Sequence, residues 1–432
     1  MRRKVLLALL IGAFAGSFAF AAGKQEPAKI TVWGCFSELQ APLDKAVEVF
    51  KVKYPTVQVE TMVFDLRDFE AKVAATAPRG QAADVIIMDH SLVGRYGKAG
   101  ILSAAPSDVA DMVNTKGRYL PIAKEKLTIN GKVVGLPVFG GGPALFYNKD
   151  YLAKAGIEPP TTVDELYKAA VKLRQMDSAG TLTRAGYSIR LTGPTGGSQK
   201  FAFISNQMVG GDIIVEGKTP NTYHGNLDNE ATAKALMWHV NLLHGPDKSD
   251  DWALKHDTEG FAAGAEAMFL RESWVIPYMK QNAPNINYGV VPVPRDKYFR
   301  IYDWLVSACV PETGKNKKLA WEFAKVMQEK EVMEVLFNDS GWIPARRDLD
   351  FSDILAKEPR FKVFITNPPE AEVYFEVNAS AYTELWTKVG EIIQEAYRDK
   401  GLVNNLAGCR AVVKKANDIA NQILKESGEY GE

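Results

Sequence analysis

Two short segments of the sequence place an acidic residue beside aromatic side chains. Phe36 and Glu38 follow a predicted buried strand, and Asp303 stands between Tyr302 and Trp304. An aromatic face can stack on the C–H surface of a sugar or polyol, and a carboxylate accepts hydrogen bonds from the hydroxyl groups. A binding cleft needs both kinds of group, because an apolar pocket alone does not orient its ligand. Glu38 also has a purely structural explanation, since an acid stabilises the N-terminus of the helix that follows.

Catalytic and metal-binding alternatives find little support in the sequence. A glycoside hydrolase needs two carboxylates held roughly 5 to 9.5 Å apart around one bond, and no segment indicates such a pair, although the sequence does not exclude one. The five histidines lack the HxxxH or HxH spacing of a metal site. A complete P-loop, a GxSxG turn and an HExxH helix are also absent from the sequence. We therefore predict a binding protein without enzyme activity, cofactor or metal.

The N-terminal segment 1–22 has the three parts of a secretory signal peptide. Basic residues occupy positions 2–4, an apolar run covers positions 5–20, and Ala-Phe-Ala at 19–21 forms a small-x-small cleavage site. The apolar run is shorter than the about 20 residues that a membrane-spanning helix needs. The cleavage site has no cysteine. We therefore expect a periplasmic protein that is secreted through a cleavable signal peptide and has no lipid anchor.

Charge and length restrict the partner and the number of domains. The chain has 52 basic and 52 acidic residues, and loss of the three basic residues of the signal peptide leaves 49 against 52, a net charge of about −3. This balance argues against a nucleic-acid partner, because proteins that bind nucleic acids usually present a basic surface. About 410 mature residues exceed what one hydrophobic core normally holds, so two lobes are expected.

The three cysteines, Cys35, Cys309 and Cys409, are an odd number for an oxidising compartment. At most one pair of them can form an internal disulfide. Cys309 lies in the apolar run 305–310 and is expected to be a buried small hydrophobic residue rather than a reactive thiol.

The N-terminal part of the chain alternates short strands with helices. This order predicts a parallel sheet with helices on its faces. A second alternating series begins after the capping box of Thr162 and Glu165. The first series comprises a strand at 30–33, a helix between Pro42 and Pro55, a strand at 57–63, a helix near 68–76 and a strand at 84–88.

Three consecutive glycines, 140–142, separate two strand-like runs that end at Val138 and Tyr147. Glycine has no Cβ atom, so the backbone can bend widely and approach a ligand closely at this point. An ordinary glycine-rich loop is the alternative. Two later apolar runs, 286–294 and 304–310, are interpreted as further crossings between lobes.

Four separated segments of the chain resemble one protein family. They are ITVWG followed by KAVEVFKVKYPTVQVE, then ADVIIMDHSLVGRYGKAGIL, then the glycine stretch, and last the segment 260–349 with FAAGAEAMFLRESW, YGVVPVP, NKKLAWEFAKVM and SGWIPARRDL. In order and spacing the chain is similar to the extracellular solute-binding proteins of bacterial ABC importers, in the sugar-type family 1 that includes maltodextrin-binding proteins.

The resemblance implies an α/β fold of the type II periplasmic binding proteins. Each of two lobes is then a mainly parallel sheet flanked by helices, and the ligand is held in the cleft between the lobes. The lobes close on the solute, and a membrane permease recognises the closed, monomeric protein. The expected division gives lobe 1 residues 23–141 plus 288–330 and lobe 2 residues 142–287 plus 331–432, with crossings near 138–146, 285–292 and 328–334.

The resemblance also suggests further ligand contacts. Asp89 lies where the family commonly places a ligand-contacting acid, although it could equally cap the next helix. Trp274 matches a stacking tryptophan, and Lys200 lies where relatives have an aromatic or polar contact. A mono- or oligosaccharide is the expected solute, with a polyol or a phosphorylated or acidic small molecule as the alternative. The expected ligand-binding residues are Phe36, Ser37, Glu38, Asp89, His90, Gly141, Gly142, Lys200, Glu272, Trp274, Tyr302, Asp303, Trp304, Trp342 and Tyr382.

Overall fold

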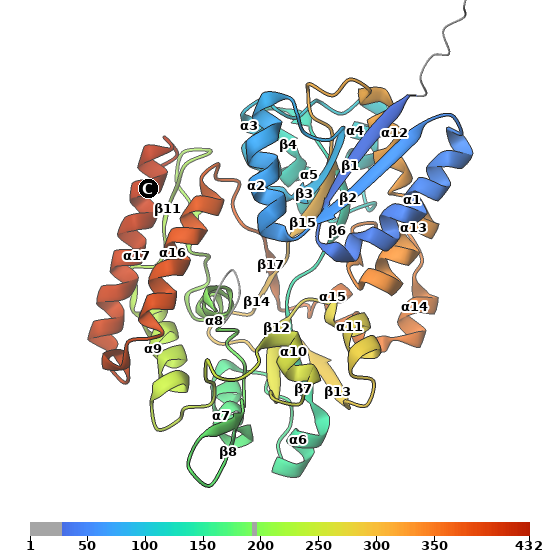
Figure 1. The fold of residues 1–432 in the computed structure, drawn as a ribbon. Helices are drawn as coiled ribbons and strands as arrows, with labels where there is room; N and C mark the ends of the chain where they lie inside the picture. Colours follow the sequence, from blue (N-terminus) through green and yellow to red (C-terminus); the bar gives the residue numbers. More distant parts are fainter. Residues whose placement is uncertain (1–27, 192–196) are drawn as a thin grey trace, which may run out of the picture.

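A six-stranded sheet lies at the centre of the N-terminal part of the protein (Figure 1). The computed structural model describes residues 28–191 and 197–432, and the predicted signal peptide lies outside them. The strand order is β16-β6-β15-β3-β1-β2. β1 pairs in parallel with β2 and β3, whereas β15 and β16 run antiparallel to their neighbours. The strands are β1 (Lys29–Cys35), β2 (Gln58–Phe64), β3 (Val85–Asp89), β6 (Leu136–Gly140), β15 (Leu305–Cys309) and β16 (Ile343–Pro344).

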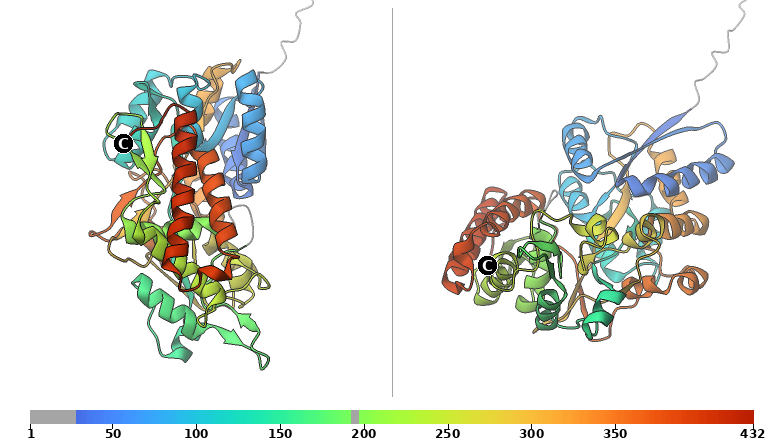
Figure 2. Two further views of the ribbon diagram at one scale, coloured as in Figure 1. Left: turned by 90° about the vertical axis from the view of Figure 1, so that its left-hand side faces the viewer. Right: turned by 60° about the horizontal axis from the view of Figure 1, so that its bottom comes forward.

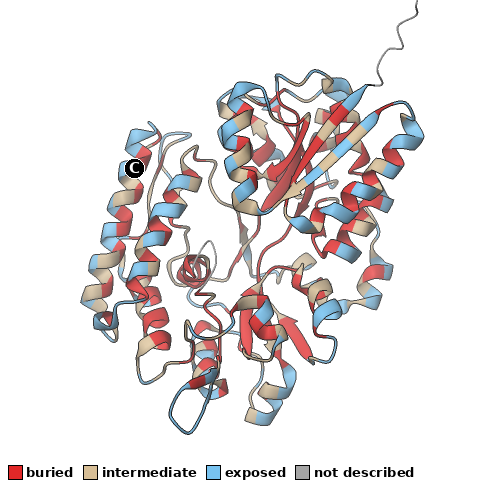
Figure 3. Ribbon diagram, viewed as in Figure 1, coloured by how far each residue is buried: buried red, intermediate tan, exposed pale blue. Residues whose placement is uncertain are grey.

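Helices flank this sheet and bury their apolar positions against it. In the first helix the apolar residues at helical spacing, Leu43, Ala46 and Phe50, are buried and Val47 is half-buried, while the outer faces of the helices are exposed (Figure 3). The elements around the sheet are α1 (Gln40–Lys53), α2 (Leu66–Thr76), α3 (His90–Lys98), α4 (Ser107–Asn114), α5 (Pro121–Leu127), α12 (Lys317–Val326), α13 (Lys330–Val335) and the small strands β4 (Thr128–Ile129) and β5 (Lys132–Val133).

The second part of the molecule contains a three-stranded sheet in the order β12-β7-β13. Both outer strands run antiparallel to β7, so the expectation of mainly parallel sheets holds for β1, β2 and β3 but not here. The pair β14 and β17 is parallel. The strands are β7 (Ala144–Asn148), β8 (Gln175–Met176), β9 (Leu182–Arg184), β10 (Ile214–Glu216), β11 (Tyr223–Gly225), β12 (Met268–Arg271), β13 (Tyr288–Val291), β14 (Arg300–Tyr302) and β17 (Glu372–Tyr374).

Helices make up most of this second part. The predicted capping box of Thr162 and Glu165 is present and begins α7. Figure 2 shows α16 and α17 side by side. The helices are α6 (Lys149–Ala155), α7 (Val163–Leu173), α8 (Ser198–Val209), α9 (Glu230–His244), α10 (Asp257–Ala262), α11 (Val275–Asn282), α14 (Ser352–Lys357), α15 (Lys362–Ile365), α16 (Tyr382–Ala396) and α17 (Leu406–Glu426).

Three hydrophobic clusters correspond to these parts. The first core surrounds the six-stranded sheet and includes Ile87 and Val306. The second core lies among the helices α7, α8, α9, α16 and α17 and includes Leu236. The third core packs on the three-stranded sheet and includes Phe146 and Phe361. The first core lies on the six-stranded sheet (the first unit) and the other two lie in the second part (the second unit), and half-buried residues such as Trp274 and Tyr302 pack where two cores meet.

The chain crosses between these units more than once, and two crossings differ from the expected boundaries. The run 288–291 was expected with the first lobe, but as β13 it pairs with β7 in the three-stranded sheet. Val332, Met333 and Leu336 belong to the first core, because α13 packs against α1. The third crossing therefore lies beyond the expected 328–334. A later segment connects the units again: Phe375 packs against the first core, and Ala379 belongs to the second.

Cys35, Cys309 and Cys409 are all free and buried. The first two lie in the first core and the third lies in the second core. Burial raises the pKa of the Cys309 thiol, in agreement with its predicted role as a core residue. Within 28–191 and 197–432, no helix is long and apolar enough to span a membrane, and no group of His, Cys, Asp and Glu could hold a metal ion.

Candidate binding site between the packed units

A cavity of about 380 Å³ has walls from both parts of the molecule, in the volume range of small-molecule sites. One wall comes from the loops after β1 and β3 and from α2. The other comes from the loop after β12, from the segment before α16 and from α16 itself. The lining residues are Phe36, Glu38, Leu66, Arg67, Glu70, Asp89, Ser91, Arg190, Gln199, Arg271, Glu272, Trp274, Tyr302, Trp304, Trp342, Glu376, Tyr382, Thr383 and Trp386.

Three aromatic rings form one continuous surface of this cavity. The centroid of the Phe36 ring lies 5.6 Å from the ring centroids of both Trp304 and Trp342, and the centroids of the two indoles are 5.1 Å apart. Phe36 has a φ of 74°, which non-glycine residues rarely adopt, and its N–H donates to the Phe64 carbonyl at 2.9 Å. The neighbouring strand thus fixes the ring in position. The indole N–H of Trp342 has no hydrogen-bond partner among the described residues.

Asp89 caps a helix, one of the two roles expected of it, and its position leaves the second role, a ligand contact, open to it. One carboxylate oxygen accepts from the Ser91 N–H at 2.7 Å and caps α3, and the side chain also lines the cavity. Glu38 lines the same wall. Ser37, in contrast, is exposed and does not line the cavity, so its assignment as a ligand contact was wrong. It lies in a short 3-10 turn whose neighbouring residues face inward.

His90 is also a correction, because it is completely buried and does not line the cavity. Its Nδ1 accepts from the Leu305 N–H at 3.4 Å, and its Nε2 lies 3.9 Å from a carboxylate oxygen of Glu376. Burial lowers the pKa of His90. The ring therefore packs between β15 and the segment that enters α16, where it contacts Glu376 of the cavity wall.

The glycines and Asp303 join two crossing segments instead of facing a ligand. The Gly141 N–H donates to Asp303 Oδ1 at 2.8 Å, and the same oxygen accepts from the Trp304 N–H at 2.8 Å. A Cβ atom on Gly142 would lie 1.6 Å from the Tyr302 carbonyl oxygen. None of the three residues lines the cavity, which corrects their assignment. The glycines are needed because two backbones touch here.

Lys200 is the last correction. Its side chain is completely buried, and its ammonium group donates to the Leu270 carbonyl oxygen. Burial, together with nearby Arg271, lowers the pKa of Lys200 to about 7. An α8 position that resembled a ligand contact therefore points into the protein interior beneath β12. It does not line the cavity.

The loop after β12 supplies a connected set of polar groups. Glu272 Oε2 lies 3.0 Å from Arg271 Nη1 and accepts from the Trp274 indole N–H at 3.2 Å. Burial opposes ionisation of Glu272, but Arg271 and Lys200 hold its pKa below the ordinary value. Glu272 is therefore ionised at neutral pH and fixes the edge of the Trp274 ring at the cavity wall.

Two tyrosines of the cavity wall donate to half-buried acids. Tyr302 O–H donates to Glu376 at 2.8 Å, and Tyr382 O–H donates to Asp212 at 2.9 Å. Burial, with the negative charges of Asp89 and Asp212, raises the pKa of Glu376 well above its ordinary value. Both tyrosine rings line the cavity, as predicted, and each is oriented by its acid.

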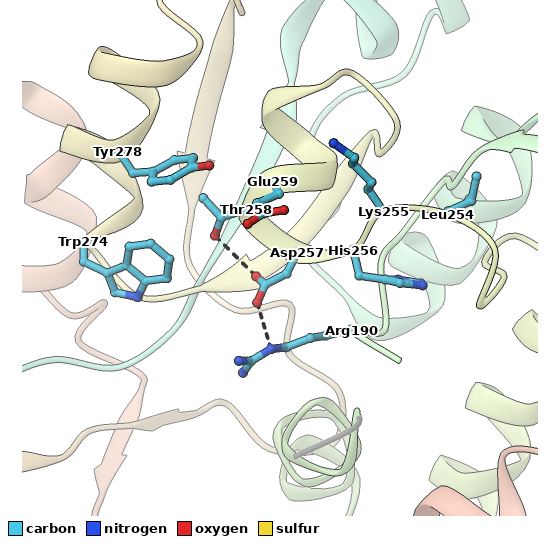
Figure 4. A pocket seen from close by; sticks show the side chains of 9 residues that line it. All are labelled: Arg190, Leu254, Lys255, His256, Asp257, Thr258, Glu259, Trp274 and Tyr278. Carbon is cyan, nitrogen blue, oxygen red and sulfur yellow. Dashed lines mark hydrogen bonds and ion pairs between the residues drawn. The ribbon is translucent and has the colours of Figure 1, made fainter. Parts of the chain in front are cut away.

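A second hollow of about 460 Å³ adjoins the cavity and shares Arg190 and Trp274 with it. Trp274 and Tyr278 stand on one side of it, with Arg190 and Asp257 on the other (Figure 4). A carboxylate oxygen of Asp257 lies 2.8 Å from Arg190 Nε.

A sequence model of the family described as bacterial extracellular solute-binding protein matches residues 45–363. The chain belongs to this family. The solute-binding protein is 23% identical over 408 residues to the maltotriose-binding protein of Pyrococcus abyssi, a match that covers 92% of this chain and 82% of that protein.

Solved structures of ABC transporter solute-binding proteins have the same fold as this solute-binding protein. One, from Thermotoga lettingae with bound α-D-tagatose, has a TM-score of 0.77 at 21% identity and covers 92% of this chain and 100% of its own. Another, from Agrobacterium vitis with bound D-mannitol, has a TM-score of 0.69 at 19% identity and covers 93% of this chain and 99% of its own.

Several cavity residues of this solute-binding protein were not predicted. Glu376 lies in the segment EVYFEV, whose acidic and aromatic residues were a usable signal. Nothing in the local sequence of Arg190 indicates that Asp257 holds it near Arg271. The residues missed are Leu66, Arg67, Glu70, Ser91, Arg190, Gln199, Arg271, Glu376, Thr383 and Trp386.

Proposed function

We propose that this solute-binding protein captures a small carbohydrate in the cavity between its packed units and delivers it to the permease of an ABC importer. The observation that carries the proposal is the composition of the cavity wall. Aromatic rings from both units, Phe36 and Trp304 on one side and Trp274 on the other, stand beside carboxylates that can accept hydroxyl hydrogen bonds. The resemblance to binders of maltotriose, tagatose and mannitol supports this class of solute.

The proposed mechanism is closure of the two units on the solute. A solute that contacts both walls binds the closed arrangement better than the open one, and so shifts the population toward it. The crossing segments around Gly141 and Tyr302 would act as the hinge. The protein would work in the periplasm as a monomer, after loss of the predicted signal peptide.

A thermal-shift screen of mono- and oligosaccharides and polyols tests the proposal. Binding to the native state raises the apparent stability by RT ln(1 + [L]/Kd). We expect at least one sugar to raise the midpoint, and calorimetry then gives its Kd. Release of a cleaved product, or the absence of binding by every sugar and polyol, would contradict the proposal.

Trp274→Ala then tests whether the cavity is the binding site. The ring is half-buried at the cavity wall, so its removal leaves the main cores intact. We expect binding to weaken about tenfold, since an aromatic contact contributes roughly 0.5–1.5 kcal/mol. Trp252→Ala is the matched control, because Trp252 is also half-buried but packs on His244 outside the cavity. Equal effects of the two substitutions would locate the sugar elsewhere.

A further inference from the structure

Asp257 holds two arginine side chains together at one wall of the cavity. Its two carboxylate oxygens lie 2.9 Å from Arg271 Nε and 2.8 Å from Arg190 Nε. Both arginines line the cavity. Because each guanidinium contacts Asp257 through its Nε, the terminal nitrogens are left to other partners. Nη1 of Arg271 lies 3.0 Å from Glu272, and one terminal nitrogen of Arg190 donates to Gln199 at the long distance of 3.4 Å.

The two arginines of this group are only partly paired by the described residues. Asp257 and Glu272 contact Arg190 and Arg271 at no more than two nitrogens each. Lys200, whose pKa burial lowers to about 7, carries only part of a charge at neutral pH. The side chains of Arg190 and Arg271 are only 19% and 12% exposed. A buried N–H donor that lacks an acceptor is costly.

The backbone at this place is strained in a way that brings the charges together. Arg190 has a φ of 59° and Asp257 a φ of 63°, both in the left-handed region that side chains other than glycine rarely adopt. Such conformations persist when surrounding structure imposes them, and they cluster at ligand-binding sites. The two residues come from distant parts of the sequence and meet only at the wall shared by the cavity and the second hollow.

We propose that the solute carries an acidic group, a carboxylate or a phosphate on a sugar-like body, and that Arg190 and Arg271 bind this group. The inference rests on the proposed function and specifies its substrate class. Arginine suits the task, because its planar fork of N–H donors matches a carboxylate or phosphate with two parallel hydrogen bonds. The hydroxyl groups of the solute then face Glu38 and Asp89 on the opposite wall.

The opposite walls thus give the solute one orientation. The wall of β1 and β3 offers acceptors, which suit neutral hydroxyls and repel an acidic group. The wall after β12 offers guanidinium donors beside Glu272, whose carboxylate is already paired with Arg271 and the Trp274 indole. Arg67 on the first wall does not alter this polarity, because it is paired with Glu70 at 2.6 Å within α2.

A paired panel measured by calorimetry tests the substrate class. Each neutral mono- or disaccharide is compared with its carboxylate and its phosphate, for example D-galactose with D-galacturonate and D-glucose with D-glucuronate and D-glucose 6-phosphate. D-Glucosamine supplies a cationic member. We expect an acidic member to bind at least about tenfold more tightly than its neutral counterpart, and its affinity to fall as salt increases. The carboxylate and phosphate members distinguish the two sources of charge.

Substitutions then assign the preference to the arginines. Arg190→Gln and Arg271→Gln should each lower affinity for the acidic member at least about tenfold, and by a larger factor than they lower affinity for the neutral member. Arg271→Lys keeps the charge but loses the forked geometry, and serves if Arg271→Gln fails to fold. Arg410→Gln removes the same charge from an ion pair with Asp228 outside the cavity, and should change neither affinity.

The outcomes separate this inference from the proposed function. Tighter binding of neutral sugars or of D-glucosamine overturns the acidic class and leaves sugar capture standing. An acid preference that survives both arginine substitutions also overturns the inference. If neither neutral nor acidic sugars bind, the proposed function fails, and the inference fails with it.

Discussion

Among single residues, Asp303 shows most clearly how position decides role. It is buried, and one of its oxygens accepts two backbone N–H groups from the crossing segments. Burial raises the pKa of Asp303 to about 6, against the opposing effect of Arg347. The side chain therefore acts as a structural link whose charge is unfavourable in the folded state.

The first prediction at this scale concerns pH. The folded state holds the Asp303 proton more tightly than the unfolded state, so its contribution to stability is complete below about pH 4 and is lost as pH rises to about 6. The loss is about 3 kcal/mol. Asp303→Asn keeps the accepting oxygen and removes the charge. We expect the variant to be no more stable than the parent at pH 4 and more stable at pH 7, in urea unfolding at both values.

Asp348→Asn provides a control of opposite sign. The hydrogen bond from Arg346 holds the pKa of Asp348 below its ordinary value, so its removal should cost stability at pH 7 and cost less at low pH. The free energies of unfolding of Asp303→Asn and the parent should differ by an amount that changes with pH. A difference that stays constant from pH 4 to 7 would contradict the raised pKa of Asp303.

Local sequence showed which residue types the site uses, but not which way each one points. Tyr302 and Trp304 line the cavity, whereas Asp303 between them faces the crossing backbone, because successive side chains of an extended segment alternate in direction. The prediction treated the three as one cluster. Lys200 was misassigned for a related reason, since a buried lysine and a cavity lysine look the same in a sequence.

At the scale of elements, α3 is tied to the C-terminal part of the chain. Lys98 Nζ lies 2.8 Å from Glu429 and donates to the Asn378 carbonyl at 2.7 Å. Glu429 also accepts from the N–H and the O–H of Ser380, both at 2.7 Å. One carboxylate thus links a helix of the first unit with the segment that enters α16.

We expect Glu429→Ala to lower the free energy of unfolding by about 2 kcal/mol, because hydrogen bonds to a charged group are lost together. The Ser380 amide should also exchange faster in hydrogen–deuterium exchange. Lys414→Met breaks the exposed pair with Asp418, and should cost less than about 1 kcal/mol. Equal losses for the two variants would show that the link is no stronger than a surface ion pair.

Element order was predictable where strands and helices alternate locally, and less so where distant segments pair. The strands at 30–33, 57–63 and 84–88 match β1, β2 and β3 closely. The third crossing was placed too early, because the apolar face of α13 packs on α1, a partner that lies far away in sequence. The antiparallel pairing of β7 has the same origin, since both of its partners come from later segments.

For the whole molecule, separate cores joined by crossing segments predict a change of shape on binding. Small-angle scattering of the protein saturated with its solute should give a smaller radius of gyration than the free protein, because the solute favours the closed arrangement. Trp274→Ala at the same solute concentration should show a smaller decrease. An unchanged radius at saturation would exclude closure as the response to binding.

The buried, unpaired cysteines give the two units separate internal reporters. Cys35 and Cys309 become reachable by a thiol reagent only when the first core opens, and Cys409 only when the second does. A pulse of alkylating reagent during unfolding, followed by mass analysis of the three peptides, would therefore time the opening of each core in the unaltered chain. Since none of these thiols is cross-linked, the chain can reach its native state without oxidative steps.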